Sequence, residues 1–255
     1  MSFMAAGICL YEHFFVENSS RLEHFSNQYM LTSQFCYRFE DSKNVETTSR
    51  HSSGFFMLGL HAFESGNQKF PETWKADFGN NVLDYYVSQL KIPLECIYIH
   101  GDSWTDGVRR GPSLEFFIKG IESGNMVFTV ESTQGSPLEN RYLDVGLGLQ
   151  RLYSAITEEK NIYFNSVTMD SLRTIVIALK DQLYPAKLNI GYNVRKKMET
   201  ILKSDPELKN IQTNLETVFE GLEYIEDPRL NEQLMKEIIN IFSIQKKRCE
   251  QSKIL

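Results

Sequence analysis

The sequence predicts an α+β fold, in which an antiparallel β-sheet is flanked by helices and followed by a C-terminal helical region. Up to about residue 160, short β-prone runs alternate with Gly, Asn, Asp and Ser, as strands and hairpins do. Beyond that point, apolar residues recur at helical spacing. Because the strands precede the helices, a doubly wound parallel sheet is disfavoured. We therefore expect two regions, residues 1–160 and 161–255.

The predicted elements follow this division. Seven β-prone runs are expected to be strands: residues 7–16, 35–39, 54–60, 96–100, 113–121, 125–132 and 141–145. One helix is expected before Pro93, over residues 81–90. Four more helices are expected after residue 160, with breaks at prolines, over residues 168–183, 192–202, 208–222 and 230–244.

Composition excludes several classes of protein. No apolar run reaches the ~18 residues of a membrane-spanning helix, so a cytoplasmic protein without a membrane partner is expected. The four cysteines form no CxxC pair, and the five histidines have no HxH or HExxH spacing, which disfavours a disulfide framework and a histidine metal site. The net charge of −6 argues against DNA and against a broad nucleic-acid surface.

A glycine-rich turn is the first feature that suggests a binding site. Gly146 and Gly148 separate a predicted strand from a predicted helix that carries Arg151. The third glycine of a dinucleotide-binding fingerprint is missing, so that interpretation is disfavoured. Such a turn lets a ligand approach the backbone, and an arginine suits a phosphate.

A second feature is a predicted hairpin around residues 37–55. Arg38 and Glu40 are two residues apart, so they would face the same side of one strand. Residues 41–49 would form the loop, and residues 51–55 the returning strand. An arginine, a carboxylate and an aromatic ring on one antiparallel face suit ATP.

In this order and spacing, these segments resemble motifs 2 and 3 of the class II aminoacyl-tRNA synthetases. The intervening sequence is similar to the catalytic core of alanyl-tRNA synthetases over about residues 31–198. The segments that carry the resemblance are TSQFCYR, RHSSGFFMLG, the run from Trp104 to Glu115, IESGNMVF, LDVGLGLQRL and NIGYNVRKK.

The resemblance implies an ATP site with magnesium. Arg38 would bridge the α-phosphate and the amino-acid carboxylate, Phe55 would stack on adenine, and Arg151 would hold the γ-phosphate. Arg38 and Arg151 are the expected catalytic residues, and Glu122 is the expected Mg²⁺ ligand. The full ATP-binding set is Arg38, Glu40, Arg50, His51, Phe55, Gly148 and Arg151. Among the histidines, only His51 has an expected position beside a ligand.

The resemblance also implies a pocket for alanine. Its residues are Met57, Trp104, Asn125, Val127, Asp144 and Gly146. Asp144 would bind the substrate ammonium, and Met57, Trp104 and Val127 would leave room for little more than a methyl group. Without a cation, a carboxylate in an apolar strand is costly, so Asp144 needs a partner. Taken without the resemblance, Trp104 and Phe55 are more simply packing residues.

Several positions depart from the family pattern. The family's glutamate before the motif 3 arginine is Gln150, and its cysteine-containing run is replaced by Val108-Arg109-Arg110. Arg109 and Arg110 would meet pyrophosphate, an RNA phosphate or a phosphopantetheine arm. Asn189 matches an asparagine that the family uses near the tRNA acceptor stem. The family's motif 1 helix, editing domain and C-terminal domain are expected to be absent.

The expected function is ATP-dependent activation of alanine, or a similarly small amino acid, as the aminoacyl adenylate. The acceptor would be tRNA, a carrier protein or a small metabolite. The alternative is a non-catalytic paralogue that binds the amino acid or adenylate and regulates a partner.

Overall fold

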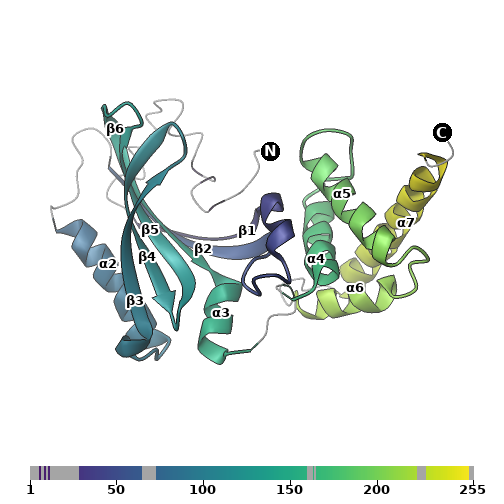
Figure 1. Cartoon of the computed structure of the whole chain (residues 1–255), viewed down its shortest axis with the longest axis horizontal. Helices are drawn as coiled ribbons and strands as arrows, with labels where there is room; N and C mark the ends of the chain where they lie inside the picture. Colours follow the sequence, from purple (N-terminus) through teal and green to yellow (C-terminus); the bar gives the residue numbers. More distant parts are fainter. Residues whose placement is uncertain are drawn as a thin grey trace. The chain divides into compact units, whose positions relative to one another are not determined.

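A computed structural model describes residues 6, 9, 11, 29–64, 73–159, 163, 165–222 and 228–252 (Figure 1). The chain divides into two compact units. Unit 1 comprises Met1–Cys36 and Phe55–Glu159, and unit 2 comprises Tyr37–Gly54 and Lys160–Leu255. No helix in the described part of the chain is long and apolar enough to cross a membrane.

Unit 1 is built on one sheet of six strands, in the order β1-β2-β6-β5-β4-β3. The strands are β1 (Tyr29–Tyr37), β2 (Gly54–Glu64), β3 (Ile97–Thr105), β4 (Arg109–Ile118), β5 (Ile121–Ser132) and β6 (Pro137–Gly148). The pairs β2–β6, β6–β5, β5–β4 and β4–β3 are all antiparallel. The predicted antiparallel sheet is confirmed. Most of the strand predicted at residues 7–16 lies outside the described residues, and the two described there, Cys9 and Tyr11, have helical rather than extended backbone.

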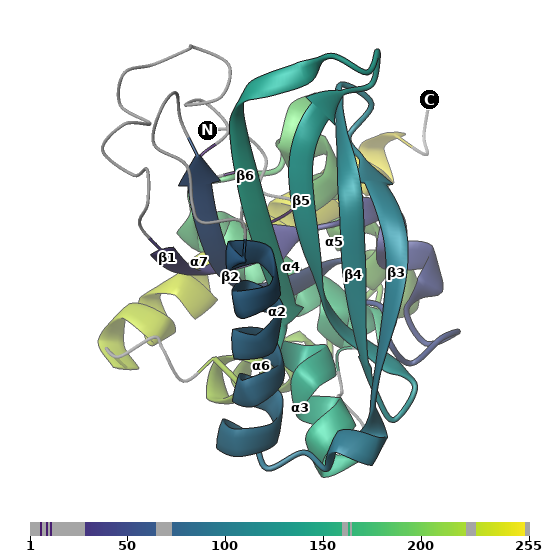
Figure 2. The same cartoon turned by 90° about the vertical axis from the view of Figure 1, so that its left-hand side faces the viewer.

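Helices cover one face of this sheet. Figure 2 shows α2 (Trp74–Asp84) crossing in front of the strands, with α3 (Leu149–Thr157) beside it. Alternate strand residues meet these helices in a buried core, which includes Ala62, Phe78, Val82, Phe116, Met126, Leu143, Val145 and Leu152. The other alternate residues point to the opposite face, where the Tyr11 ring packs against His61 and Phe63.

The helix predicted at residues 81–90 is longer than expected. It begins at Trp74 and continues after Asp84 into a π-helical turn, η4 (Tyr85–Gln89), before the short 3₁₀ turn η5 (Leu94–Cys96). Gly79, Asn80 and Asn81 are poor helix formers, which hides the first turns from a periodicity argument. Packing of Phe78 and Val82 in the core stabilises them instead.

The strand predicted at residues 35–39, with Arg38 and Glu40 on one side, is wrong beyond Tyr37. Arg38 leaves the strand with φ −126° and ψ 77°, and η3 (Phe39–Asn44) is a 3₁₀ helix. Arg38 and Glu40 therefore do not alternate on one strand. Polar side chains such as Asp41 compete for backbone groups and favour turns over extended chain. The returning strand also begins later than predicted, at Gly54, although the Arg38 amide still donates to the Ser53 carbonyl at 2.9 Å.

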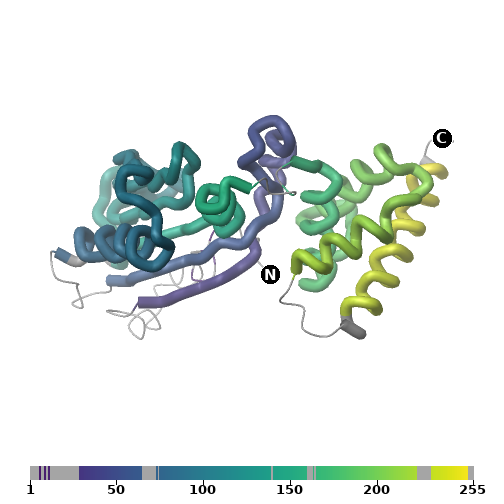
Figure 3. The backbone as a smooth tube through the Cα atoms, turned by 90° about the horizontal axis from the view of Figure 1, so that it is seen from below, coloured from purple at the N-terminus to yellow at the C-terminus, as the bar shows by residue number. Residues whose placement is uncertain are grey.

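Unit 2 contains the four helices predicted after residue 160. They are α4 (Val167–Lys180), α5 (Asn189–Ser204), α6 (Ile211–Glu220) and α7 (Pro228–Ser252), drawn from green to yellow in Figure 3. Ser166 caps α4 by accepting from the Met169 amide at 3.2 Å. Because residues 170–179 are all buried, α4 is the central helix, and it packs against α5, α6 and α7. The C-terminal helical region is confirmed.

Candidate functional site

The face of the unit 1 sheet opposite α2 and α3 carries the predicted amino-acid-binding residues. Asn125 lies opposite Gly146, and Val127 lies opposite Asp144, in the pairing of β5 with β6. Met57 lies opposite the last residue of β6. Directly opposed residues of an antiparallel pair point to the same side. Three strands thus bring these five residues, far apart in the sequence, onto one surface.

Met57 and Asn125 close tightly over Gly146. A Cβ atom at position 146 would lie 3.1 Å from the Met57 Sδ and 3.5 Å from the Asn125 Oδ1. The space between these side chains is therefore small, and it exists only because residue 146 is glycine. Trp104 lies on β3, opposite Gly111, and strand alternation puts it on this face two strands away from Val127.

Asp144 has a partner within the protein, which the sequence did not indicate. Its Oδ1 lies 2.9 Å from the Nδ1 of His61, whose side chain is fully buried, whereas 14% of the Asp144 side chain is exposed. Both atoms are buried, and they are not aligned for a hydrogen bond. On the other side of the ring, the His61 Nε2 lies 2.9 Å from the Thr32 hydroxyl.

Glycine makes room for the His61 ring. A Cβ atom at Gly59 would lie 2.4 Å from the His61 Nε2 and from the Thr32 Oγ1. The sequence singled out His51 as the histidine beside a ligand and missed His61. The signal was the spacing of Met57, Gly59 and His61, which puts all three on one face of β2.

The predicted phosphate end of the site lies at the start of α3. Gly148 is the N-cap residue of α3, and the Arg151 Nη1 lies 2.8 Å from the Glu122 Oε2. Both side chains are partly exposed, at 22% for Arg151 and 41% for Glu122. A carboxylate oxygen suits Mg²⁺, and a guanidinium beside it suits a phosphate, so the residues fit the implied groups. Gln150 has a structural contact, because its Oε1 accepts from the Phe56 amide at 3.0 Å.

The other predicted nucleotide-binding residues are divided between the units. Phe55, the second residue of β2, belongs to unit 1 and points to the same side as Met57. Arg38, Glu40, Arg50 and His51 belong to unit 2. There the His51 Nδ1 lies 2.7 Å from the Thr48 hydroxyl, and Glu40 and Arg50 are exposed.

The chain is similar in sequence to known alanine–tRNA ligases. No family model matches the chain. Among curated proteins, it is 40% identical to an alanine–tRNA ligase of Cenarchaeum symbiosum over 141 residues, which are 53% of this chain and 15% of that protein. It is 35% identical to the alanine–tRNA ligase of Methanocella arvoryzae over 154 residues, 58% of this chain and 17% of that protein. The chain is alanyl-tRNA synthetase-like.

The likeness to these relatives covers only part of them. A third alanine–tRNA ligase, from Nitrosopumilus maritimus, is 25% identical across 88% of this chain, which corresponds to 33% of that protein. The alanyl-tRNA synthetase-like chain thus spans a third or less of the length of these relatives. Among solved structures, a pyrrolysyl tRNA synthetase of Desulfitobacterium hafniense matches with a TM-score of 0.40 and 13% identity, over 62% of this chain and 51% of that chain.

A buried polar cluster in unit 2 was also missed by the sequence analysis. It consists of Ser42, Ser52, Ser53, Asp170, Arg173 and Lys197, and we call it the Asp170 cluster. Asp170 accepts from the Ser52 hydroxyl at 2.6 Å and from the Ser53 amide at 2.8 Å. Its other oxygen lies 3.1 Å from the Lys197 ammonium. These contacts join the segment that carries Arg38 and His51 to α4 and α5.

The two cations of the Asp170 cluster, Arg173 and Lys197, have further hydrogen-bonding partners. Arg173 donates to the Ser52 hydroxyl at 2.7 Å and to the Gly54 carbonyl, and its guanidinium lies 3.7 Å from the centre of the Tyr163 ring. Lys197 donates to Ser42 at 3.1 Å. Burial lowers the pKa of Lys197, and the Asp170 carboxylate partly opposes this shift. The signal in the sequence was a set of charged residues within the apolar runs of α4 and α5.

The residues predicted to contact an acceptor have local partners. Arg109 pairs with Asp106 at 2.7 Å, and Arg110 pairs with Glu131 at 2.9 Å. Because they are consecutive on β4, the two arginines point to opposite sides of the sheet rather than to one phosphate. Asn189 is exposed at the start of α5 in unit 2, with φ +56°.

A cavity of about 580 Å³ lies on the helix-covered side of the sheet, away from the predicted site. Its lining is mainly apolar and comprises Leu31, Thr32, Ser33, Leu58, Gly59, Leu60, Asn81, Val82, Tyr85, Val145 and Leu147. None of the predicted site residues lines it. The cavity lining has no carboxylate for the ammonium of an amino acid, so the opposite sheet face remains the candidate.

Proposed function

We propose that the chain activates alanine, or another small amino acid, with ATP to form the aminoacyl adenylate, and then transfers the aminoacyl group to an acceptor. The acceptor is a tRNA or a non-tRNA molecule, such as a carrier protein or a small metabolite. Similarity to alanine–tRNA ligases supports an aminoacylation-related function.

The observation that carries the proposal is the small space above Gly146, next to the Asp144 carboxylate. An amino-acid ammonium would bind the part of the Asp144 carboxylate that faces away from His61 and is exposed. Because only 14% of this side chain is exposed, water screens the charge weakly and the attraction is strengthened. The proximity of Met57 and Asn125 to position 146 favours a side chain no larger than a methyl group.

The reaction needs no protein nucleophile. A carboxylate oxygen of the amino acid attacks the α-phosphorus of ATP, the bond to the bridging oxygen breaks, and pyrophosphate leaves with the electron pair. The protein contributes by positioning the reactants and by neutralising charge. In the proposal, Arg38 acts at the reacting centre, Arg151 at the γ-phosphate, and Phe55 on the adenine ring.

Magnesium would enter with the nucleotide. Bound Mg²⁺ would supply charge neutralisation on the phosphate oxygens, and Glu122 is the residue that would hold it. Before ATP binds, the Arg151–Glu122 pair keeps a cation and an anion together on the surface. Until then, the pair keeps both side chains oriented. When ATP binds, Arg151 would leave the Glu122 carboxylate and contact a phosphate instead.

Alanine-dependent exchange of pyrophosphate into ATP tests the activation step. Asp144→Asn should lower kcat/KM for alanine by roughly 10²- to 10⁴-fold, since leaving a buried charge uncompensated costs about 3–5 kcal/mol. Asp84→Asn, a change of the same kind on the exposed side of α2, is the matched control and should leave the exchange unchanged. Equal exchange in Asp144→Asn and the parent would overturn the proposed role of Asp144.

A second measurement decides the acceptor. With exchange established, the protein is offered total tRNA, and transfer of labelled alanine to acid-precipitable RNA is followed. Acylated tRNA supports the tRNA alternative. Exchange without tRNA acylation supports a carrier protein or a small metabolite.

A non-catalytic role in binding and regulation is the second candidate. The pairing of Arg151 with Glu122 favours it, because the two groups expected to meet phosphate and magnesium bind each other. Binding of an alanyl-sulfamoyl adenosine analogue, together with no exchange for any amino acid, would support this role over catalysis.

A further inference from the structure

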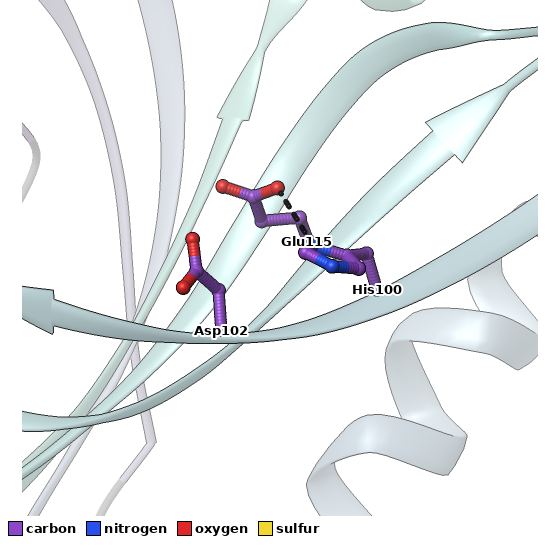
Figure 4. A group of neighbouring side chains, drawn as sticks. All are labelled: His100, Asp102 and Glu115. Atoms are coloured by element: carbon purple, nitrogen blue, oxygen red, sulfur yellow. Dashed lines mark ion pairs between the residues drawn. The ribbon is translucent and has the colours of Figure 1, made fainter.

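Three side chains from two neighbouring strands converge beside the proposed amino-acid site. Figure 4 shows His100 and Asp102 of β3 with Glu115 of β4. One ligand atom from each residue lies within 4.8 Å of the others. His100 and Asp102 are two residues apart on β3, and Glu115 lies directly opposite His100, so all three point to one side.

The spacing of two of these ligands already suits a metal ion. The His100 Nδ1 lies 3.5 Å from the Glu115 Oε2. Two ligands of a tetrahedral zinc ion, each ~2.0–2.1 Å from the metal, are about 3.3–3.4 Å apart. The third ligand, Asp102, is an exposed side chain on the same strand, so a rotamer change can bring its carboxylate inward.

Charge supplies a separate argument. Two carboxylates meet here, yet among the described residues neither Asp102 nor Glu115 is paired with a lysine or an arginine. Carboxylates elsewhere in unit 1 differ: Asp106 and Glu131 each hold an arginine within 3 Å. Like charges held together without a cation repel each other, and a bound cation would relieve the repulsion. An imidazole with two carboxylates is a ligand set for zinc rather than for magnesium.

We propose that His100, Asp102 and Glu115 form a binding site for a divalent transition-metal ion, with Zn²⁺ as the favoured occupant. Three protein ligands leave the fourth position of a tetrahedral ion open to water or a ligand. Glu115 lies opposite Asn125, so the ion would sit on the same sheet face as the predicted amino-acid pocket. The site is independent of the proposed function.

Zinc titration of the metal-free protein tests the site directly. Competition with a chromogenic chelator should give one equivalent of bound Zn²⁺. His100→Ala, Asp102→Asn and Glu115→Gln should each weaken binding by at least roughly tenfold, because loss of even a supporting contact around a metal costs about 10- to 100-fold. Glu131→Gln on β5 and His51→Ala in unit 2 are matched controls and should bind as the parent does. Thermal unfolding of each metal-free variant checks that the fold is kept.

Cobalt substitution identifies the ligand atoms. Co²⁺ bound by one imidazole and two carboxylates gives visible bands without a thiolate charge-transfer band. A thiolate band would place the ion on a cysteine and overturn the proposal. Absence of a stoichiometric site, or equal affinity of His100→Ala and the parent, would overturn it as well.

Discussion

The two units hold their charged groups in contrasting ways. In the Asp170 cluster of unit 2, the side chains of Asp170 and Lys197 are 1% and 7% exposed, and every Asp170 oxygen has hydrogen-bonding partners. On the sheet face of unit 1, the exposed fraction rises to 14% for Asp144 and 41% for Glu122. Asp144 and Glu122 also have fewer hydrogen-bonding partners than Asp170, and the contact of Asp144 with His61 is not aligned for a hydrogen bond.

The difference separates charges that hold the fold from charges that can bind a ligand. A carboxylate whose oxygens already accept hydrogen bonds has little capacity left to bind a ligand. Removing it leaves other buried charges unpaired. A partly exposed carboxylate with a single partner can exchange that partner at small cost. We therefore expect changes in the Asp170 cluster to alter stability, and changes on the sheet face to alter binding and catalysis.

The largest expected effect is on stability, in unit 2. Asp170→Ala should lower the free energy of unfolding by about 3–5 kcal/mol, because it leaves Lys197 buried without its anion and removes the acceptor of the Ser52 hydroxyl that Arg173 also contacts. Urea unfolding followed by circular dichroism measures it. Asp181→Ala, which removes an exposed aspartate with one bond to Tyr37, should cost about 1 kcal/mol or less. Similar losses in both variants would contradict the contrast between the regions.

The next effect separates catalysis from stability in unit 1. Arg151→Ala should lower the rate of pyrophosphate exchange by roughly 10²- to 10³-fold, the usual cost of removing one group that stabilises developing charge. The same change should cost about 1 kcal/mol or less of stability, because the pair with Glu122 is partly exposed. Exchange kinetics and urea unfolding on the same variant give both values. A large loss of stability with an unchanged exchange rate would show that Arg151 stabilises the fold and does not act in catalysis.

A smaller effect is expected on amino-acid binding. Gly146→Ala should raise the KM for alanine by roughly tenfold or more, since crowding of a pocket by one methyl group is worth about 1–3 kcal/mol. The added Cβ would lie 3.1 Å from the flexible end of Met57, so the fold should tolerate it. Gly79→Ala on α2, whose Cβ would lie 3.3 Å from the Met126 Cε on the other side of the sheet, is the control. An unchanged KM in Gly146→Ala would place the substrate elsewhere.

Alkaline pH should change stability with opposite signs through two buried groups, Tyr86 in unit 1 and Lys197 in unit 2. Burial raises the pKa of Tyr86 in unit 1 to about 12 from 10.0, although its bond to Ser123 partly opposes the shift. Between these values the folded state keeps a proton that the unfolded state has lost, so stability falls as pH rises, by about 1.4 kcal/mol per pH unit.

Lys197 in unit 2 should change stability with pH in the opposite direction. Its pKa is lowered from 10.5, so between its folded pKa and 10.5 the unfolded state binds more protons and stability rises with pH. Urea unfolding in alkaline buffers should show a shallower loss in Tyr86→Phe and a steeper loss in Lys197→Met. The same pH dependence in both variants would contradict these signs.

Much of the architecture could be predicted from sequence periodicity. Alternation of apolar and polar residues located β2, β5 and β6, and helical spacing located α4 to α7, because each pattern is local. The prediction for the segment after Tyr37 was wrong, because polar side chains and the backbone hydrogen bond from Arg38 to Ser53 determine its conformation. No local pattern distinguishes that arrangement from a strand.

The groups missed at the site depend on pairing between distant residues. His61 meets Asp144, and Asp170 meets Ser52 and Lys197, only after the chain has folded. The same holds for His100 and Glu115, which meet across two neighbouring strands in the proposed metal site. Spacing along the chain disfavoured a histidine metal site because it considers only neighbours in sequence. The family resemblance supplied Asp144 and Gly146 but not the groups that position them.

Binding of alanyl-sulfamoyl adenosine, measured by calorimetry, tests most directly whether the sheet face of unit 1 is the ligand site. We predict stoichiometric binding to the parent and to Asp181→Ala, and a dissociation constant raised by roughly 10²-fold or more in Asp144→Asn. No binding to the parent, or equal binding by Asp144→Asn, would contradict the assignment of this surface.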